Sequence, residues 1–203
     1  MNKEFKINGK IIETERLILR AFKEDDLNDF FEYASVDGVG EMAGWRHHSS
    51  TSETKTILDI FINHDITFAI TLKENGKVIG SIGIEKYPLE DKLTEFNNYY
   101  GRELGFVLSK DYWGRGLMTE AVKATIDYLF NELDLDFLIC GYFTFNSRSK
   151  RVQEKCGFIP YRVVKHINYD GAEITTILNL LSNPRKNIEY DFSHEESLLI
   201  KKI

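Results

Sequence analysis

The chain has 203 residues, of which 42% are hydrophobic and 29% are charged, and its formal net charge is −6 at pH 7. This composition is typical of a soluble globular protein and excludes a largely disordered chain. The acidic balance argues against nucleic acid as a partner and is compatible with a cationic small molecule or a basic peptide.

Signals for export or membrane insertion are missing from the sequence. The N-terminus carries no apolar signal region, and no apolar run approaches the ~18 residues of a membrane span. The two cysteines, Cys140 and Cys156, form no CxxC pair and stand away from the histidines, so they indicate neither a metal site nor a redox motif. Isolated cysteines suit a reducing compartment. We therefore expect a cytoplasmic protein with no membrane partner and no metal.

Hydrophobic periodicity predicts alternating strands and helices after a short leader at residues 1–13. The expected order is β-α-α-β-β-β-α-β-α-β-β, at residues 16–22, 23–35, 52–64, 67–72, 77–87, 99–109, 117–133, 136–144, 146–158, 158–169 and 173–181. Ser52 is a candidate N-cap of the second helix, and Asn75-Gly76 is a strong hairpin signal between two strands.

This order predicts an α/β fold with a mixed central sheet of about seven strands flanked by about four helices. The near-continuous apolar run at 136–144 is typical of a strand buried on both faces. We expect a single domain over residues 1–182, followed by a charged C-terminal extension over 183–203. The oligomeric state stays open between a monomer and a homodimer.

The segment Trp113-Gly114-Arg115-Gly116 lies between a predicted strand and a predicted helix. Backbone N–H groups at a helix start favour a phosphate, and glycines let the backbone approach it closely. The same glycines would also serve a purely structural turn. The P-loop lysine and the third glycine of the dinucleotide fingerprint are both missing, which argues against a nucleotide-binding protein.

A second segment resolves this ambiguity. The stretch "NSRSKRVQEKCGF" follows a buried strand about thirty residues later. Together with "ETERLILR" and "GRELGFVLSKDYWGRGLMTEA", it resembles the GNAT superfamily of acetyl-CoA-dependent N-acetyltransferases. The similarity covers almost the whole chain. Within the superfamily, the sequence resembles the branch that includes the ribosomal-protein-alanine and spermidine acetyltransferases. It implies transfer of an acetyl group from acetyl-CoA to a primary amine by direct attack in a ternary complex, without a metal.

The resemblance also implies a set of acetyl-CoA-binding residues. The backbone of one strand would bind the pantetheine arm, a turn would surround the pyrophosphate, and a downstream helix start would contact the pantetheine and the thioester sulfur. In that order, the residues are Phe106, Val107 and Leu108; Trp113, Gly114, Arg115, Gly116, Leu117, Met118 and Thr119; and Asn146 and Ser149.

Two positions depart from the family pattern. Met118 stands where a small residue is usual in the pyrophosphate turn. Gln153 stands where many members have the tyrosine that protonates the departing thiolate, and an amide cannot act as an acid. Ser149 is then the candidate acid, either by donating its proton directly or by positioning a water. This substitution also leaves open an alternative, a catalytically inactive CoA-binding regulatory module.

The attacking ammonium must first lose a proton, and Glu103 on the cofactor strand is the candidate base. The opposing interpretation is a solvated or salt-bridged strand glutamate. A backbone N–H of the same strand could stabilise the oxyanion. Trp45, His48 and Tyr87 are the expected acceptor-binding residues, although the histidine could equally be an exposed loop residue and the tyrosine a sheet-packing residue.

Overall fold

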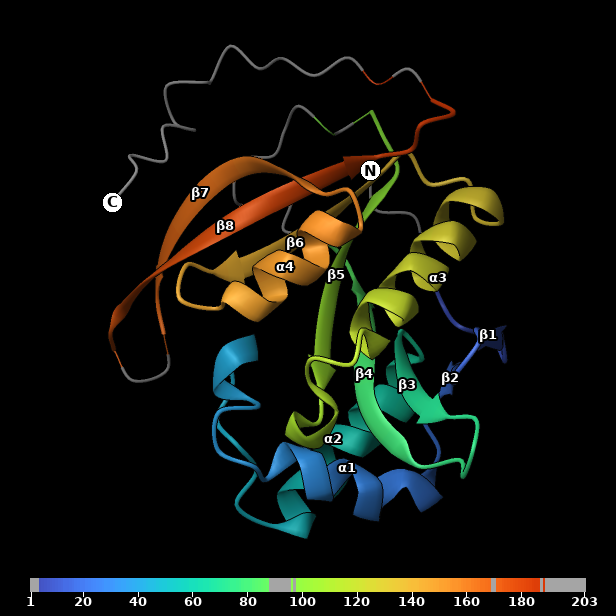
Figure 1. Cartoon of the computed structure of the whole chain (residues 1–203), viewed down its shortest axis with the longest axis vertical. Helices are drawn as coiled ribbons and strands as arrows, with labels where there is room; N and C mark the ends of the chain where they lie inside the picture. Colours follow the sequence, from blue (N-terminus) through green and yellow to red (C-terminus); the bar gives the residue numbers. More distant parts are fainter. Residues whose placement is uncertain (1–3, 88–95, 97, 169–170, 187, 189–203) are drawn as a thin grey trace. The chain divides into compact units, whose positions relative to one another are not determined.

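The computed structural model describes residues 4–87, 96, 98–168, 171–186 and 188 (Figure 1). These residues form two compact units. The N-terminal unit comprises residues 4–84 and 105–128, and the C-terminal unit comprises the described residues of 85–104 and 129–188. Two strands and one helix contribute residues to both units. The strand order across the sheet is β1-β2-β3-β4-β5-β6-β8-β7.

The N-terminal unit is built on an antiparallel meander with two helices. Its strands pair in sequence order, and Figure 1 shows the two helices side by side. Its elements are β1 (Ile12–Glu13), β2 (Leu17–Ala21), α1 (Leu27–Ala34), α2 (Thr51–His64), β3 (Thr67–Leu72) and β4 (Val78–Glu85). Phe30 and Phe61 stack with ring centroids 5.5 Å apart in its core, so an aromatic cluster joins the two helices.

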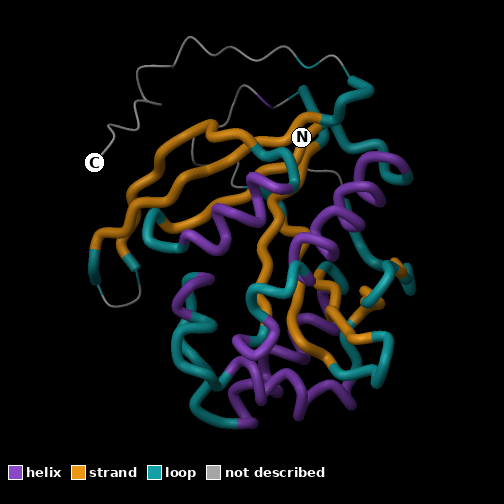
Figure 2. Tube along the Cα trace, viewed as in Figure 1, coloured by secondary structure: helices purple, strands orange, loops and turns teal. Residues whose placement is uncertain are grey.

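The C-terminal unit combines a parallel strand pair with a long hairpin. Its elements are the first half of β5 (Gly101–Leu108), the end of α3 (Leu117–Asn131), β6 (Phe137–Phe143), α4 (Ser147–Lys155), β7 (Ile159–Ile167) and β8 (Glu173–Ser182). Figure 2 shows β7 and β8 as two long strands that run side by side, and β8 pairs in turn with β6. Gly101 is required here because a Cβ on it would lie 2.2 Å from Cζ of Phe137.

The mixed α/β fold with four helices is confirmed among the described residues, but its sheet has eight strands rather than about seven. The additional strand is β1, in the segment that we expected to be a leader. Ile7 is only 2% exposed, and its N–H donates to the carbonyl oxygen of Asp65 over 2.8 Å. Residues 4–13 of the expected leader are therefore ordered and pack into the unit.

Most of the turn and cap residues that the sequence predicts are found at those positions in the structure. Gly76 has the positive φ of 73° that the predicted Asn-Gly hairpin needs, and Gly157 follows α4 with a φ of 88°. The N-cap of α2 is Ser50, whose side chain accepts from the N–H of Glu53, and not Ser52. The structure contains no helix, among the described residues, that is long and apolar enough to cross a membrane.

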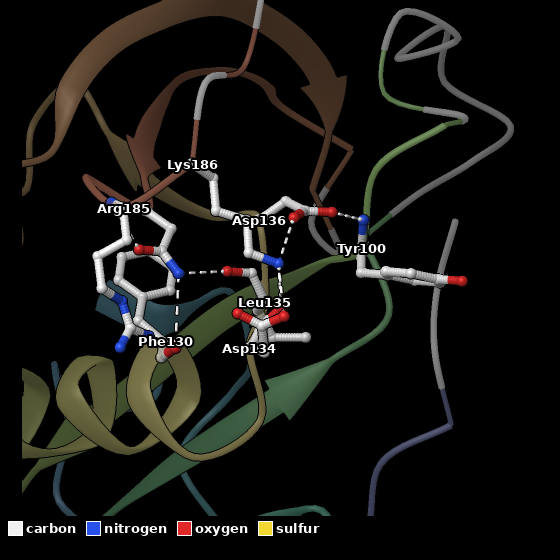
Figure 3. Close-up of polar contacts among 8 residues, drawn as sticks. Tyr100, Phe130, Asp134, Leu135, Asp136, Arg185 and Lys186 are labelled. Carbon is white, nitrogen blue, oxygen red and sulfur yellow. Dashed lines mark hydrogen bonds and ion pairs between the residues drawn. The ribbon is translucent and has the colours of Figure 1, made fainter.

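The chain beyond β8 is tied to the loop between α3 and β6 (Figure 3). Asn183 is fully buried, and its Nδ2 donates to the carbonyl oxygen of Leu135 over 2.8 Å. Lys186 pairs with Asp134 and Asp136, at 2.8 and 2.9 Å. The start of the expected C-terminal extension is thus part of the C-terminal unit, while residues 187 and 189–203 lie outside the described residues.

Replacing Asn183 by Ala should destabilise the protein by about 1–3 kcal/mol, because two buried carbonyl oxygens would lose a donor. Urea unfolding measures this change. Glu132→Ala, at an exposed position near the end of α3, is the control. Equal unfolding free energies for the two variants would contradict the anchoring role of Asn183.

Candidate active site

The segment before α3 is an exposed turn with two left-handed glycines. Gly114 and Gly116 have φ values of 76° and 78°, a region that side chains other than glycine rarely adopt. The N–H of Glu120 donates to the carbonyl oxygen of Gly116 over 3.0 Å, which starts the helix directly after the turn. In an α-helix the first N–H groups lie outside the i→i−4 hydrogen-bonding pattern and point outward from the helix start, which is the arrangement that phosphate sites use.

The side chains around the turn hold it in place. The indole Nε1 of Trp113 donates to the carbonyl oxygen of Leu108 over 2.8 Å, which ties the turn to the end of β5. The Arg115 guanidinium lies over the Tyr112 ring, 5.1 Å from its centroid. Met118 is only 6% exposed, so this larger residue places its side chain in the interior and leaves the exposed turn unobstructed.

The second half of β5 lies close against β4. A Cβ on Gly80 would stand 2.3 Å from the carbonyl oxygen of Val107, and the N–H of Ser109 donates to Ile79 over 2.7 Å. Any side chain at position 80 would therefore displace this part of β5. Of the expected pantetheine-binding strand, Phe106 and Val107 are half-buried and Leu108 is buried.

The start of α4 carries a polar network in the C-terminal unit. Asn146 caps the helix, because its Oδ1 accepts from the N–H of Ser149 over 3.1 Å. The Gln153 amide is fully buried, and its Nε2 donates both to Ser149 Oγ and to the carbonyl oxygen of Gly141, each at 3.1 Å. Asn179 on β8 donates to the Oε1 of the same amide over 2.9 Å.

This network determines the direction of the Ser149 hydrogen bond. A backbone carbonyl oxygen can only accept, so the group of Gln153 that faces Gly141 must be its NH₂. The same NH₂ donates to Ser149 Oγ, and the hydroxyl therefore acts as an acceptor toward Gln153. Its own hydrogen is left to be donated to another group. Gln153 is no acid, as the sequence indicated, yet it orients the residue that can be one.

Glu103 has the electrostatics of a base that works near neutral pH. It lies on the first half of β5, paired in register with Ile139 of β6, and is half-buried. Burial and the negative charge of Glu85 raise the pKa of the Glu103 carboxyl from 4.5 to about 7. A shift of this kind distinguishes Glu103 from an ordinary solvated strand glutamate.

Cys140, the residue after Ile139, is a poor nucleophile. Its thiol is buried, and burial together with the nearby Glu103 and Cys156 raises its pKa well above the usual value. A protonated thiol attacks thioesters slowly. Cys140 is therefore not a candidate nucleophile.

The three expected acceptor-binding residues differ in exposure. Trp45 is half-buried against the N-terminal core. His48 is 6% exposed, its Nδ1 lies 2.8 Å from Oγ1 of Thr54, and burial lowers its pKa. Tyr87 is 1% exposed and packs against Phe137 in the core of the C-terminal unit. Only Trp45 thus presents substantial surface.

One cluster in the glycine-rich loop has potential metal ligands, which the sequence pattern did not reveal. The ligand atoms of Asp37, Glu41 and His47 lie within 4.8 Å of one another. Glu41 Oε1 is 2.9 Å from His47 Nδ1, and Glu41 also accepts from the N–H groups of His47 and Gly38. Although burial opposes it, these hydrogen bonds lower the pKa of Glu41 to about 2. The internal bonds account for the arrangement of the cluster.

Two contributors to the site were missed in the sequence. Asn179 stands out only as a polar residue in the apolar run "TILNLL", and Glu85 only as a charge at the end of a strand. Each acts on a residue far away in the chain, Gln153 and Glu103 respectively, so local patterns carry no signal for them.

Comparison with known proteins places these features in a family. A model described as "Acetyltransferase (GNAT) domain" matches residues 16–159. Among curated relatives, YoaA of Bacillus subtilis (strain 168), described as an uncharacterized N-acetyltransferase, is 25% identical over 182 residues, covering 87% of this chain and 98% of the relative. YjcK of the same organism, a probable N-acetyltransferase, is 27% identical over 164 residues, covering 77% and 84% of the two chains.

Solved structures share the fold. An acetyltransferase (GNAT family) from Bacillus anthracis has a TM-score of 0.75 at 24% identity and covers 86% of this chain and 99% of its own. The ribosomal-protein-S5-alanine acetyltransferase from Vibrio fischeri has a TM-score of 0.68 at 22% identity and covers 89% of this chain and 100% of its own. At these identities, the likeness is one of fold.

The raised pKa of Glu103 has a consequence for stability. Between pH 4.5 and about 7, the folded protein holds a proton on Glu103 that the unfolded chain releases, so the carboxyl lowers stability as the pH rises. The unfolding free energy of the wild type, relative to Glu103→Gln, should therefore fall by about 2–3 kcal/mol across this window. Denaturant unfolding at several pH values measures it. A difference that is constant with pH would contradict the burial of this carboxyl.

Proposed function

This chain belongs to the GNAT family of acetyl-transferring enzymes, and we propose that it transfers the acetyl group of acetyl-CoA to a primary amine. The observation that carries the proposal is the extent of the family match. Residues 16–159 include Glu103, the Gly114–Gly116 turn and the Asn146–Gln153 network. The acceptor would be a protein N-terminus, a polyamine or another small amine, and the net charge of −6 suits a cationic acceptor.

In this proposal, the turn binds the pyrophosphate of acetyl-CoA through its backbone. Supporting features are the exposure of Gly114 through Gly116, their left-handed φ values and the adjoining helix start. The positive charge of Arg115 adds to the attraction, and Leu117, Met118 and Thr119 continue the turn into α3. The backbone of Phe106 through Leu108 would bind the pantetheine arm, and Asn146 would contact it at the start of α4.

Glu103 would act as the general base. An amine is protonated at neutral pH and must lose its proton before its lone pair can attack. A carboxylate whose pKa is about 7 can take that proton at the pH at which the enzyme works. The backbone N–H groups of β5 would stabilise the oxyanion of the attacked carbonyl.

Ser149 would act as the general acid. Its hydroxyl accepts from Gln153 and keeps its hydrogen for donation. It would either pass this proton to the departing thiolate and regain one from solvent, or position a water that protonates the thiolate. Trp45 and His48 of the N-terminal unit and Tyr87 of the C-terminal unit would contribute to acceptor binding, with His48 and Tyr87 at buried positions. The catalytically inactive CoA-binding module is not favoured, because the family match spans residues 16–159 and the relatives are described as N-acetyltransferases.

The release of free CoA thiol tests the proposal. The protein would be mixed with acetyl-CoA and a panel of polyamines, aminoglycosides and N-terminal peptides, and the thiol would be followed over time. We expect release that depends on at least one amine. Tight binding of acetyl-CoA without turnover on any member of the panel would favour the inactive module instead.

Gly116→Val should weaken acetyl-CoA binding by roughly tenfold or more, because a β-branched residue cannot hold the left-handed turn around the pyrophosphate. Calorimetric titration measures the affinity. Gly76→Val is a matched control, since Gly76 has a similar φ of 73° and open space around it in a distant hairpin. Equal affinities of the two variants for acetyl-CoA would show that the turn does not bind the cofactor.

Ser149→Ala should lower kcat by about 10²-fold while changing the KM for acetyl-CoA much less, because proton donation is lost in the transition state. Steady-state kinetics measure both constants. Ser147→Ala, at an exposed position in the same first turn of α4, should retain activity. A rise in KM with an unchanged kcat would make Ser149 a binding residue.

A further inference from the structure

The motif "ETERL" opens the family resemblance, yet the proposed chemistry gives its residues no role. In the structure, this motif contacts the first turn of α3. Glu120 accepts from Oγ1 of Thr14 over 2.5 Å and from the N–H of Arg16 over 2.9 Å. The Arg16 guanidinium pairs with the same carboxylate through Nε at 2.7 Å and Nη2 at 2.6 Å. Residues more than a hundred positions apart thus form one tight cluster.

The same guanidinium also holds the glycine turn. Arg16 Nη1 donates to the carbonyl oxygen of Arg115 over 3.1 Å. Arg16 Nη2 is the atom nearest to the Cβ position of Gly116, at 3.7 Å. The Arg16 side chain therefore lies along the turn, and 44% of its surface is exposed to solvent.

The hydrogen bonds leave part of the guanidinium available. Arginine has five N–H hydrogens, and the contacts with Glu120 and Arg115 engage three of them. Among the described residues, no acceptor lies within hydrogen-bond distance of the remaining hydrogen on each terminal nitrogen of Arg16. The guanidinium geometry matches the oxygens of a phosphate group.

The charges of Arg16 and Glu120 also suit a phosphate at the turn. A carboxylate in the first turn of α3 would repel an anion at the helix start. Although burial opposes it, the hydrogen bonds from Thr14 and Arg16 lower the pKa of Glu120 and keep it ionised. The positive charge of Arg16 offsets this negative charge, and Glu120 in turn keeps the guanidinium beside the turn.

We propose that Arg16 is a ligand of a phosphate of acetyl-CoA and that Glu120 is the residue that positions it. The inference rests on the proposed function, because it assigns new residues to the same turn. The phosphate would accept from the two remaining N–H groups of Arg16, while the bond to the Arg115 carbonyl keeps the turn open to it. Thr14 holds the carboxylate from the other side.

Calorimetric titration with acetyl-CoA and with S-acetylpantetheine, which lacks every phosphate, tests the inference. Arg16→Gln should bind acetyl-CoA about 10- to 100-fold more weakly and bind S-acetylpantetheine as the wild type does. The matched control is Arg20→Gln, four residues further along on β2, which breaks a bidentate pair with Asp26. It should leave the acetyl-CoA affinity unchanged.

The Glu120→Gln variant distinguishes two effects of this carboxylate on acetyl-CoA binding: positioning of Arg16 and repulsion of the phosphate. Removal of a negative charge beside a phosphate would by itself strengthen binding. If Glu120 positions Arg16, acetyl-CoA should instead bind at least threefold more weakly in this variant. Tighter binding would overturn the positioning role.

The remaining outcomes distinguish the inference from the proposed function. If the wild type binds acetyl-CoA and Arg16→Gln binds it equally well, only the inference is overturned. The same holds if Arg16→Gln loses affinity for both ligands alike, because the effect would then not depend on phosphate. If the wild type does not bind acetyl-CoA, the proposed function fails and the inference falls with it.

Discussion

The parallel pairing of β5 with β6 is the constraint on which the site depends. It sets Gly101 opposite Phe137 and Glu103 opposite Ile139, and the tight contact at Gly101 leaves no room for a side chain. Because the neighbouring β6 is buried from Phe137 to Cys140, a carboxyl at position 103 is drawn into a poorly solvated environment. A strand pairing thus produces the electrostatics that a proton acceptor needs.

The Gln153 network is a second consequence of burial. A fully buried amide must satisfy both of its ends, and Gly141 and Asn179 impose its orientation. Ser149 then receives a hydrogen bond rather than giving one. Under the proposed function, Gln153 at the position that the resemblance assigns to an acidic tyrosine is compatible with catalysis, because this amide orients a neighbouring hydroxyl whose hydrogen can be donated.

Sequence patterns predicted the elements well because burial leaves a periodic signal along the chain. The strand β1 was missed because two residues are too few to show alternation, and Ser50 lay just outside the expected helix start. The glycines of the turn were visible because their φ values demand that residue type. The Arg16–Glu120 pair and the effect of Glu85 on Glu103 could not be predicted, since they join residues that only the folded chain brings together.

In the proposed mechanism, burial makes Glu103 a base near neutral pH. The most direct measurement is an NMR titration of the protein with ¹³C-labelled glutamate, in which the Glu103 carboxyl resonance is assigned by its loss in Glu103→Gln. We expect a midpoint near the pKa of about 7 that burial and the charge of Glu85 impose. A midpoint at the ordinary value of 4.5 would contradict it, because Glu103 would then be a common solvated carboxylate.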